Sequence, residues 1–262
     1  MQVIVCLKQI LDPEMPSGSF HLDPERKRAI PPPGTPPVLS PFDENALEAA
    51  LRLKDGQGAK VIAISLGDKL ARAVVKKPLS AGADELILLE DPDWEDLDHF
   101  ASARILAAAI RKIGEFDLIL TGRQAADWDA GLVGSALAEE LDLGCITLAR
   151  KIEIVKDKVR VERVAPDGYE VVEALRPCVI TVDSDLGELR QITMPGIFAA
   201  KKKPIREWKP ADLELSSPAP ARCELVDLYI PKRGTVCEII GGESPEEAAL
   251  KLADKLLEKC PA

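Results

Sequence analysis

The sequence predicts an α/β protein built on a doubly wound, mostly parallel sheet. Short apolar runs alternate with segments of helical periodicity throughout the first half of the chain. Continuous apolar runs are typical of strands buried on both faces, and their alternation with helices favours right-handed crossovers. With 262 residues, the chain is long enough to bury a substantial core. We therefore expect one main α/β domain.

Four apolar runs in the first half are predicted strands. They span residues 3–7, 61–66, 85–89 and 116–120, and the last three are followed within two residues by glycine or by acidic residues. Apolar residues at helical spacing predict helices between them, at 41–54, 100–113 and 130–141. Residues 68–81 also read as a helix, but Pro78 should kink or end it near Lys77.

After Gly144 the pattern changes to strands with one solvated face. Alternating polar and apolar residues predict strands at 145–150, 151–155, 159–164, 169–174 and 178–182. This added β-hairpin region either continues the main sheet or forms a small second sheet.

From Met194 onward the chain reads as an extension that ends in a helix. Proline and lysine are frequent there, and Ser244 with Glu247 forms the pattern of a capping box. We expect a nucleotide-binding α/β domain at 1–193 and, at 194–262, a partner-recognition loop and a C-terminal arm that wraps a partner subunit.

Composition excludes several classes of function. The net charge of −10 disfavours nucleic-acid binding. No run approaches the length of a membrane span and no secretory signal is recognisable, so we expect no membrane insertion and a cytoplasmic location, or the mitochondrial matrix in a eukaryote. The six cysteines form no metal-binding pairs, and those inside apolar runs (Cys6, Cys145 and Cys178) are expected to be buried thiols. No metal site and no catalytic constellation is expected.

The segment 121–134 is the candidate ligand site. It leaves a predicted strand and enters a helix, where backbone N–H groups and the helix dipole favour phosphate. A strand-to-helix turn without a ligand stays an equal alternative, since the segment is neither G-x-G-x-x-G nor a P-loop. The long loop at 8–39 is expected to serve this site or a partner.

Four segments, in order, resemble the electron transfer flavoprotein beta subunit family over nearly the whole chain. They are VIVCLKQ at 3–9, SPFDENALEAALRLK at 40–54, GRQA at 122–125, and 183–189 leading into MPGIFAAKKKPI at 194–205. The resemblance implies a doubly wound sheet of the adenine nucleotide alpha hydrolase kind. It also implies a heterodimer with an alpha subunit that carries most of the contacts to a redox-active FAD.

The resemblance further implies a second nucleotide in this subunit, AMP in the common type or FAD in electron-bifurcating types. Its expected contacts are Cys6, Ser40, Pro41, Phe42, Asp43, Leu66, Gly122, Arg123, Gln124, Ala125, Asp127, Asp129, Ala130, Gly131, Leu132 and Val133. Phe42 matches the family residue nearest the redox flavin. The loop expected to recognise dehydrogenases includes Met194, Pro195, Gly196, Ile197 and Lys201.

Several positions depart from the family pattern. Ser40 stands where asparagine is usual, and Ala130, Gly131 and Val133 replace polar residues that bind the AMP phosphate in the common type. These changes leave space for a larger nucleotide, whereas the surroundings of Phe42 are more similar to the AMP type and tilt the choice slightly to AMP.

Three functions follow from the sequence. The first is an electron carrier, not a stand-alone enzyme, that passes electrons from acyl-CoA or other dehydrogenases to a quinone oxidoreductase-type or soluble acceptor. The second is a bifurcating variant whose second FAD oxidises NADH. The third is a nucleotide-binding regulatory module of the universal-stress type, against which the C-terminal arm argues.

Overall fold

The computed structural model describes residues 1–16, 19–215, 221–231 and 237–259. The chain divides into two compact units, Met1–Val226 and Asp227–Ala262. Residues 216–220 of the predicted extension and Cys260 lie outside the described residues.

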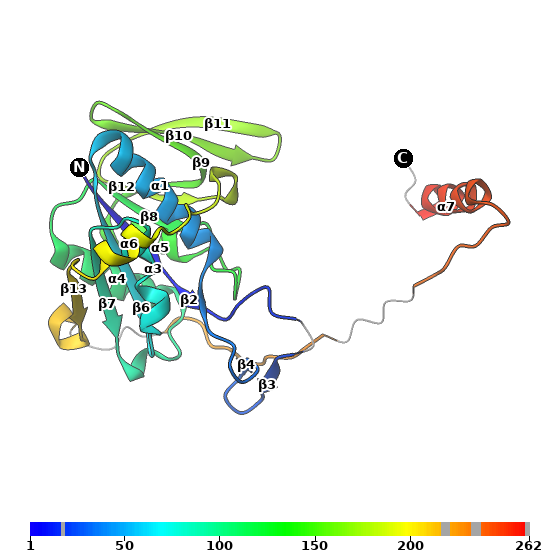
Figure 1. The fold of residues 1–262 in the computed structure, drawn as a ribbon, viewed down its shortest axis with the longest axis horizontal. Helices are drawn as coiled ribbons and strands as arrows, with labels where there is room; N and C mark the ends of the chain where they lie inside the picture. The colour runs from blue at the N-terminus through cyan, green and yellow to red at the C-terminus, as the bar shows by residue number, and fades with distance from the viewer. Residues whose placement is uncertain (17–18, 216–220, 232–236, 260–262) are drawn as a thin grey trace. The chain divides into compact units, whose positions relative to one another are not determined.

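Within the described residues, the first unit contains a nine-stranded sheet in the order β11-β10-β9-β12-β8-β1-β6-β7-β13 (Figure 1). The strands from β9 to β13 in this spatial order, β9-β12-β8-β1-β6-β7-β13, are parallel to their neighbours. The β9–β10 and β10–β11 pairs are antiparallel. The strands are β1 (Gln2–Leu7), β6 (Lys60–Gly67), β7 (Glu85–Glu90), β8 (Leu118–Gly122), β9 (Gly144–Val155), β10 (Lys158–Ala165), β11 (Gly168–Leu175), β12 (Cys178–Val182) and β13 (Ile205–Trp208). The predicted fold class is confirmed, and the hairpin region continues the main sheet.

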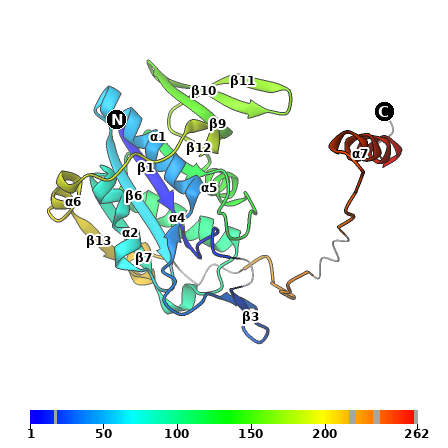
Figure 2. The same ribbon diagram turned by 45° about the vertical axis from the view of Figure 1, so that its right-hand side comes forward.

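Helices cover both faces of this sheet, as a doubly wound fold requires. The helices α1 (Pro41–Gln57), α2 (Arg72–Val75) and α3 (Lys77–Ala81) pack on one face, and α4 (His99–Ile113) and α5 (Val133–Leu141) pack on the other. Figure 2 shows α1 lying along its face of the sheet. Successive strand side chains alternate between the two cores: Val3 and Val5 face α1, whereas Ile4 and Cys6 face α4 and α5.

The break at Pro78 is confirmed. The segment forms two short helices, α2 and α3, and Pro78 lies in the first turn of the second, where its missing N–H leaves no helical bond unmade.

The chain after Met194 stays in the first unit longer than its composition indicates. The helix α6 (Met194–Ala200) packs with α3, and β13 pairs with β7 at the edge of the sheet. Trp208 is buried there, with the Lys112 Nζ 5.3 Å from its ring centroid. The strand β13 was not predicted from the sequence, because it has four residues and three of them are exposed.

The loop at 8–39 contains two small antiparallel pairs. These are β2 (Gln9–Ile10) with β5 (Val38–Leu39), and β3 (His21–Asp23) with β4 (Arg28–Ile30). Cys6 and Cys178 are buried as expected, but Cys145 is exposed, so that expectation was wrong. Cys145 is the second residue of β9 and Ile146, the next residue, is buried, so an apolar neighbourhood in sequence does not by itself bury a side chain.

The second unit contains α7 (Pro245–Lys259). Ser244 Oγ accepts the N–H of Glu247 at 3.3 Å, as the predicted cap requires, but the Glu247 carboxylate accepts the N–H of Glu243 in place of that of Ser244. Four leucines of α7 are exposed: Leu250, Leu252, Leu256 and Leu257. In the part of the chain that is described, no helix is long and apolar enough to cross a membrane.

Gly134 holds the first turn of α5 close to the ends of β8 and β12. A Cβ at this position would lie 2.5 Å from Thr181 Cγ2 and 2.8 Å from Thr121 Oγ1. Both threonines are buried strand residues with little room to move. The small residue therefore sets how near the helix terminus comes to the carboxyl edge of the sheet.

We expect Gly134→Ala to lower the free energy of unfolding by about 1–3 kcal/mol, because the helix must shift to relieve overpacking. Denaturant unfolding followed by circular dichroism measures this change. Gly144→Ala is the control, since a Cβ there meets nothing within 4 Å. Equal stability of the two variants would contradict the close approach.

Candidate functional site

The strand order reverses direction between β1 and β8. From β1 the chain builds outward through β6 and β7, and then returns to place β8 on the other side of β1. At such a switch point the carboxyl ends of two strands leave a crevice where ligands of open α/β sheets bind. The candidate site is therefore expected where Leu7 and Gly122 end their strands.

Most of the predicted nucleotide contacts lie at this edge. Cys6 and Leu66 are near the ends of β1 and β6, and Pro41, Phe42 and Asp43 form the first turn of α1. Ser40 precedes α1, and its N–H donates to the carbonyl of Lys8 at 2.9 Å. The remaining predicted contacts are Gly122 at the end of β8, Arg123, Gln124, Ala125, Asp127, Asp129, Ala130, Gly131 and Leu132 in the following loop, and Val133 at the start of α5.

The buried carboxylate of Asp43 joins three of these segments. Its Oδ2 accepts the N–H of Lys8 at 2.7 Å and its Oδ1 accepts the N–H of Gly122 at 3.0 Å. The side chain at the start of α1 thus links the ends of β1 and β8. Gly122 is required for this approach, since a Cβ there would lie 2.6 Å from Asp43 Oδ1 and 2.7 Å from the backbone of Phe42.

Burial dominates the titration of Asp43. Desolvation raises its pKa to about 7, against the opposing effect of the two backbone N–H groups and of the nearby Lys8 charge. Desolvation, with the charge of Asp43 beside it, also raises the pKa of the Cys6 thiol to about 12. Cys6 is therefore protonated and inert near neutral pH, which makes it a packing contact and not a nucleophile.

Arg123, one of the predicted nucleotide contacts, already contacts two side chains of the protein. Its Nη1 donates to Asp183 Oδ2 at 2.9 Å, and its guanidinium carbon lies 5.0 Å from the centroid of the Phe42 ring. Burial opposes ionisation of Asp183, but the hydrogen bond from Arg123 prevails and lowers the pKa of this carboxyl. Arg123 therefore holds the end of β12 to the loop and supports the Phe42 ring.

Two further contacts close the loop after β8. Lys8 Nζ forms an ion pair with Asp127 Oδ2 at 2.7 Å, and Gln124 Nε2 donates to Asp129 Oδ1 at 2.7 Å. Asp127 and Asp129 therefore fix the loop, as do Gln124 and Lys8. Lys8 and Asp183 were missed as site residues, because partners so distant in sequence leave no local pattern.

The edge retains features that fit a nucleotide. The first turn of α5 has no side-chain cap and no acidic residue, which leaves its N–H groups and dipole available to a phosphate. Among the described residues, four buried polar side-chain atoms have no hydrogen-bond partner. Glu85 Oε1 lies at the start of β7, whereas Arg123 Nε and the hydroxyls of Ser40 and Ser65 lie near the carboxyl edge. Unpaired buried polar atoms are uncommon in native structures, so the gathering of three of them near one edge favours a bound polar ligand.

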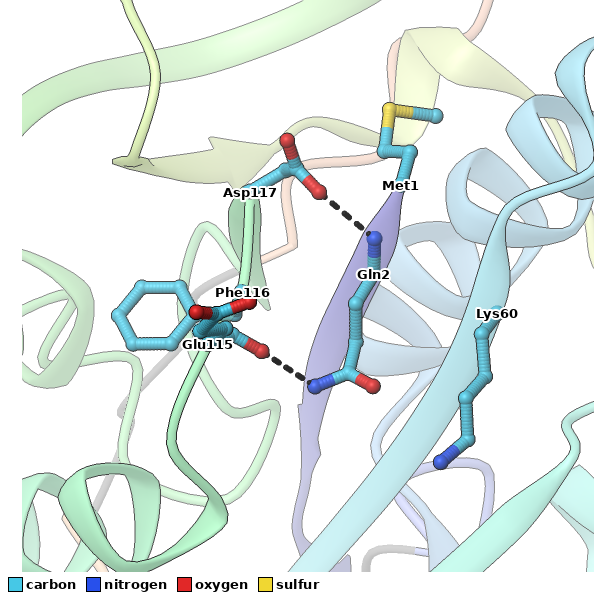
Figure 3. A pocket seen from close by; sticks show the side chains of 6 residues that line it. All are labelled: Met1, Gln2, Lys60, Glu115, Phe116 and Asp117. Atoms are coloured by element: carbon cyan, nitrogen blue, oxygen red, sulfur yellow. Dashed lines mark hydrogen bonds between the residues drawn. The ribbon is translucent and has the colours of Figure 1, made fainter.

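A hollow of about 580 Å³ lies at the opposite, amino edge of the sheet (Figure 3). Met1, Gln2, Lys60 and residues 115–117 line it, and Gln2 donates to Asp117 Oδ2 and to the carbonyl of Glu115. None of the predicted contacts lies there. Gln2, at the start of β1, already forms hydrogen bonds to residues just before β8. The carboxyl edge is therefore the better candidate for the site.

The predicted recognition residues gather on α6. Met194, Pro195, Gly196 and Ile197 form its first turn, which Thr193 caps by accepting the N–H of Gly196, and Lys201 follows its last residue. Met194, Ile197 and Phe198 are exposed, and Lys201 Nζ lies 5.2 Å from the centroid of the Phe198 ring. Phe198 is an exposed residue of this surface that was not singled out from the sequence.

The fold and the carboxyl-edge site define a nucleotide-binding α/β protein. The family model for the electron transfer flavoprotein domain matches residues 34–213. The chain belongs to the electron transfer flavoprotein family, as a homologue of its beta subunits. The protein therefore functions in electron transfer. Its cofactor is a flavin or a related nucleotide, and beta subunits of this family pair with alpha subunits.

Three relatives illustrate the similarity. The chain is 36% identical to the caffeyl-CoA reductase–Etf complex subunit CarD of Acetobacterium woodii, over 99% of each chain. It is 38% identical to an electron transfer flavoprotein subunit beta of Thermoanaerobacterium thermosaccharolyticum, over 82% of this chain and 81% of the relative. It is 39% identical to that of Megasphaera elsdenii, over 78% and 77%.

The titration of Asp43 predicts a pH dependence of stability. Its native pKa lies above the unfolded value of about 4, so between about pH 4 and 7 the native state binds more protons than the unfolded state. Its contribution to the free energy of unfolding therefore falls as the pH rises through this window. The side chain of the Asp43→Asn variant cannot titrate. The free energy of unfolding of the wild type minus that of the variant should therefore fall by up to about 4 kcal/mol between about pH 4 and 7.

Urea unfolding of both proteins at intervals across this range measures the difference. Background titrations are shared by the two proteins and cancel. A difference that increases with pH would show that the two backbone donors outweigh desolvation.

Proposed function

We propose that this chain is the beta subunit of a heterodimeric electron transfer flavoprotein and holds a second adenine nucleotide at its carboxyl edge. Electrons pass from acyl-CoA or other dehydrogenases to a quinone oxidoreductase-type or soluble acceptor, through an FAD carried mainly by the alpha subunit. The observation that carries the proposal is the joining of β1, α1 and β8 by Asp43 at the carboxyl edge of the sheet. The match to the family favours this carrier over a regulatory module of the universal-stress type.

The chain supplies position and environment, while the flavin supplies the redox chemistry. Phe42 presents a ring at the edge and Arg123 lies against that ring, so a cation is held where the family places the redox flavin. Uncapped N–H groups of α5 would hold the phosphate of the second nucleotide.

The second nucleotide is AMP or FAD. Ala130, Gly131 and Val133 provide short or apolar side chains at the start of α5, which favours space for a larger nucleotide. A second FAD would make this subunit the site of NADH oxidation in a bifurcating protein. With AMP, the subunit is an electron carrier and not a stand-alone enzyme.

Residues 194–262 would carry the partner contacts. On α6, Met194, Ile197 and Phe198 are exposed together, and a Cβ at Gly196 would lie 2.5 Å from the carbonyl oxygen of Ser80. Because α6 packs this closely on α3, its exposed side chains have a fixed position from which to bind a dehydrogenase. The exposed leucines of α7 provide an apolar surface for the alpha subunit.

Acid extraction of the co-expressed heterodimer should release one FAD and one AMP, or two FAD, for each pair of subunits. Chromatography of the extract against nucleotide standards measures both. The chain purified without its partner is the control for nucleotide held by this subunit alone. A colourless self-associating chain, or a heterodimer with a single FAD and no further adenine nucleotide, would contradict the proposal.

Phe198→Ala should slow electron exchange with an acyl-CoA dehydrogenase by about tenfold or more, as expected for an aromatic residue central to an interface. Stopped-flow absorbance of the flavin measures this rate. Reduction by dithionite needs no docking and should be unchanged. Val171→Ala, an equally simple truncation of an exposed side chain on β11, is the matched control and should exchange electrons at the wild-type rate.

A further inference from the structure

Trp128 is an unusual side chain for its place in the fold. The sequence contains three tryptophans. Trp94 and Trp208 are 7% and 9% exposed, whereas Trp128 is 52% exposed in the loop between β8 and α5. Isolated exposed apolar residues are common on protein surfaces, so exposure alone does not argue for a function. The surroundings of Trp128 supply the further reasons.

The loop that carries Trp128 is fixed on both sides of it. Asp127 pairs with Lys8, and its Oδ1 also accepts the N–H of Trp128 at 3.0 Å. Asp129 bonds to Gln124 through its side chain and donates its N–H to the carbonyl of Ala125 at 2.9 Å. The backbone on both sides of the indole is therefore held in place.

Asp129 also adopts a left-handed backbone conformation, with φ of 50°. This conformation is uncommon for residues other than glycine, although aspartate tolerates it better than most. The chain thus accepts a less favourable backbone directly after an exposed tryptophan. Uncommon backbone conformations often accompany binding sites, which agrees with the position of this loop at the switch point.

The polar side chains of the loop already have protein partners, apart from the buried Nε of Arg123. Arg123 pairs with Asp183, Gln124 with Asp129, and Asp127 with Lys8. Ala125, Ala130 and Gly131 offer little side-chain surface. Trp128 and Leu132 are the large apolar side chains that the loop exposes. Recognition of a ring at this loop therefore falls to apolar contact more than to side-chain hydrogen bonds.

We propose that the Trp128 indole is the surface on which the planar ring of the second nucleotide stacks. The ligand chemistry is a flat aromatic heterocycle joined to a phosphate, which both adenine and isoalloxazine provide. Stacking on an aromatic side chain is tolerant of ring identity, and it would compensate for the short side chains near the phosphate. The inference rests on the proposed function, since it assigns the ring contact of that same nucleotide.

Tryptophan fluorescence tests the contact directly. The emission of the wild-type heterodimer minus that of Trp128→Phe isolates Trp128 from the two buried tryptophans and from any in the partner. AMP and FAD are each added to nucleotide-depleted heterodimer, with binding measured separately by equilibrium dialysis. We expect the Trp128 emission to be quenched by the nucleotide that binds, and the two additions distinguish adenine alone from a flavin nucleotide.

Affinity tests whether the contact matters. Trp128→Ala should weaken nucleotide binding by about tenfold, in the range measured for loss of one stacked base. Trp128→Phe keeps an aromatic face and should retain most of the affinity. Tyr169→Ala removes an exposed aromatic ring from β11 and is the matched control, with wild-type affinity expected.

The outcomes separate this inference from the function on which it rests. Binding without any change in Trp128 emission, or equal affinity of Trp128→Ala and wild type, overturns the stacking contact alone. Weakened subunit association in Trp128→Ala with unchanged nucleotide affinity also overturns it, since the indole would then contact the partner. A wild-type heterodimer that binds neither AMP nor FAD overturns both.

Discussion

The site depends on one buried carboxylate. Asp43 belongs to the first turn of α1, yet it satisfies backbone donors at the ends of β1 and β8. Without an acceptor, those two N–H groups would be left unpaired beside the switch point, which is unfavourable in a buried setting. The cost is the desolvation of a carboxylate, visible as its raised pKa. Some stability near neutral pH is therefore lost, while the ends of β1 and β8 are held together.

The sequence predicts the parallel core well because its signals are local. The runs at 3–7 and 61–66 are apolar on both faces, and such runs have few other stable arrangements. Pro78 likewise acts through its own backbone. By contrast, Ile205–Trp208 becomes a strand because the edge of β7 is available to it, a fact that no neighbouring residue records. The exposure of Cys145 at the start of β9 is likewise not recorded in the apolar residues that follow it.

The site follows the same division. The place of the loop after β8 could be predicted, since strand-to-helix junctions at the carboxyl edge are a general property of doubly wound sheets. The role of Arg123 could not, because its partner Asp183 is 60 residues away and at the end of another strand. In the structure its guanidinium contacts Asp183 and the face of Phe42.

The long sequence separations within the crevice bear on how the protein is made. Lys8 and Asp43 leave the ribosome early, but Gly122 is 79 residues beyond Asp43, and Asp183 is later still. The carboxylate lacks its second donor until β8 has been translated and inserted beside β1. Arg123 likewise lacks its partner until Asp183, which follows β12, has been translated. The set of contacts proposed to bind a nucleotide is therefore complete only after most of the first unit has been made.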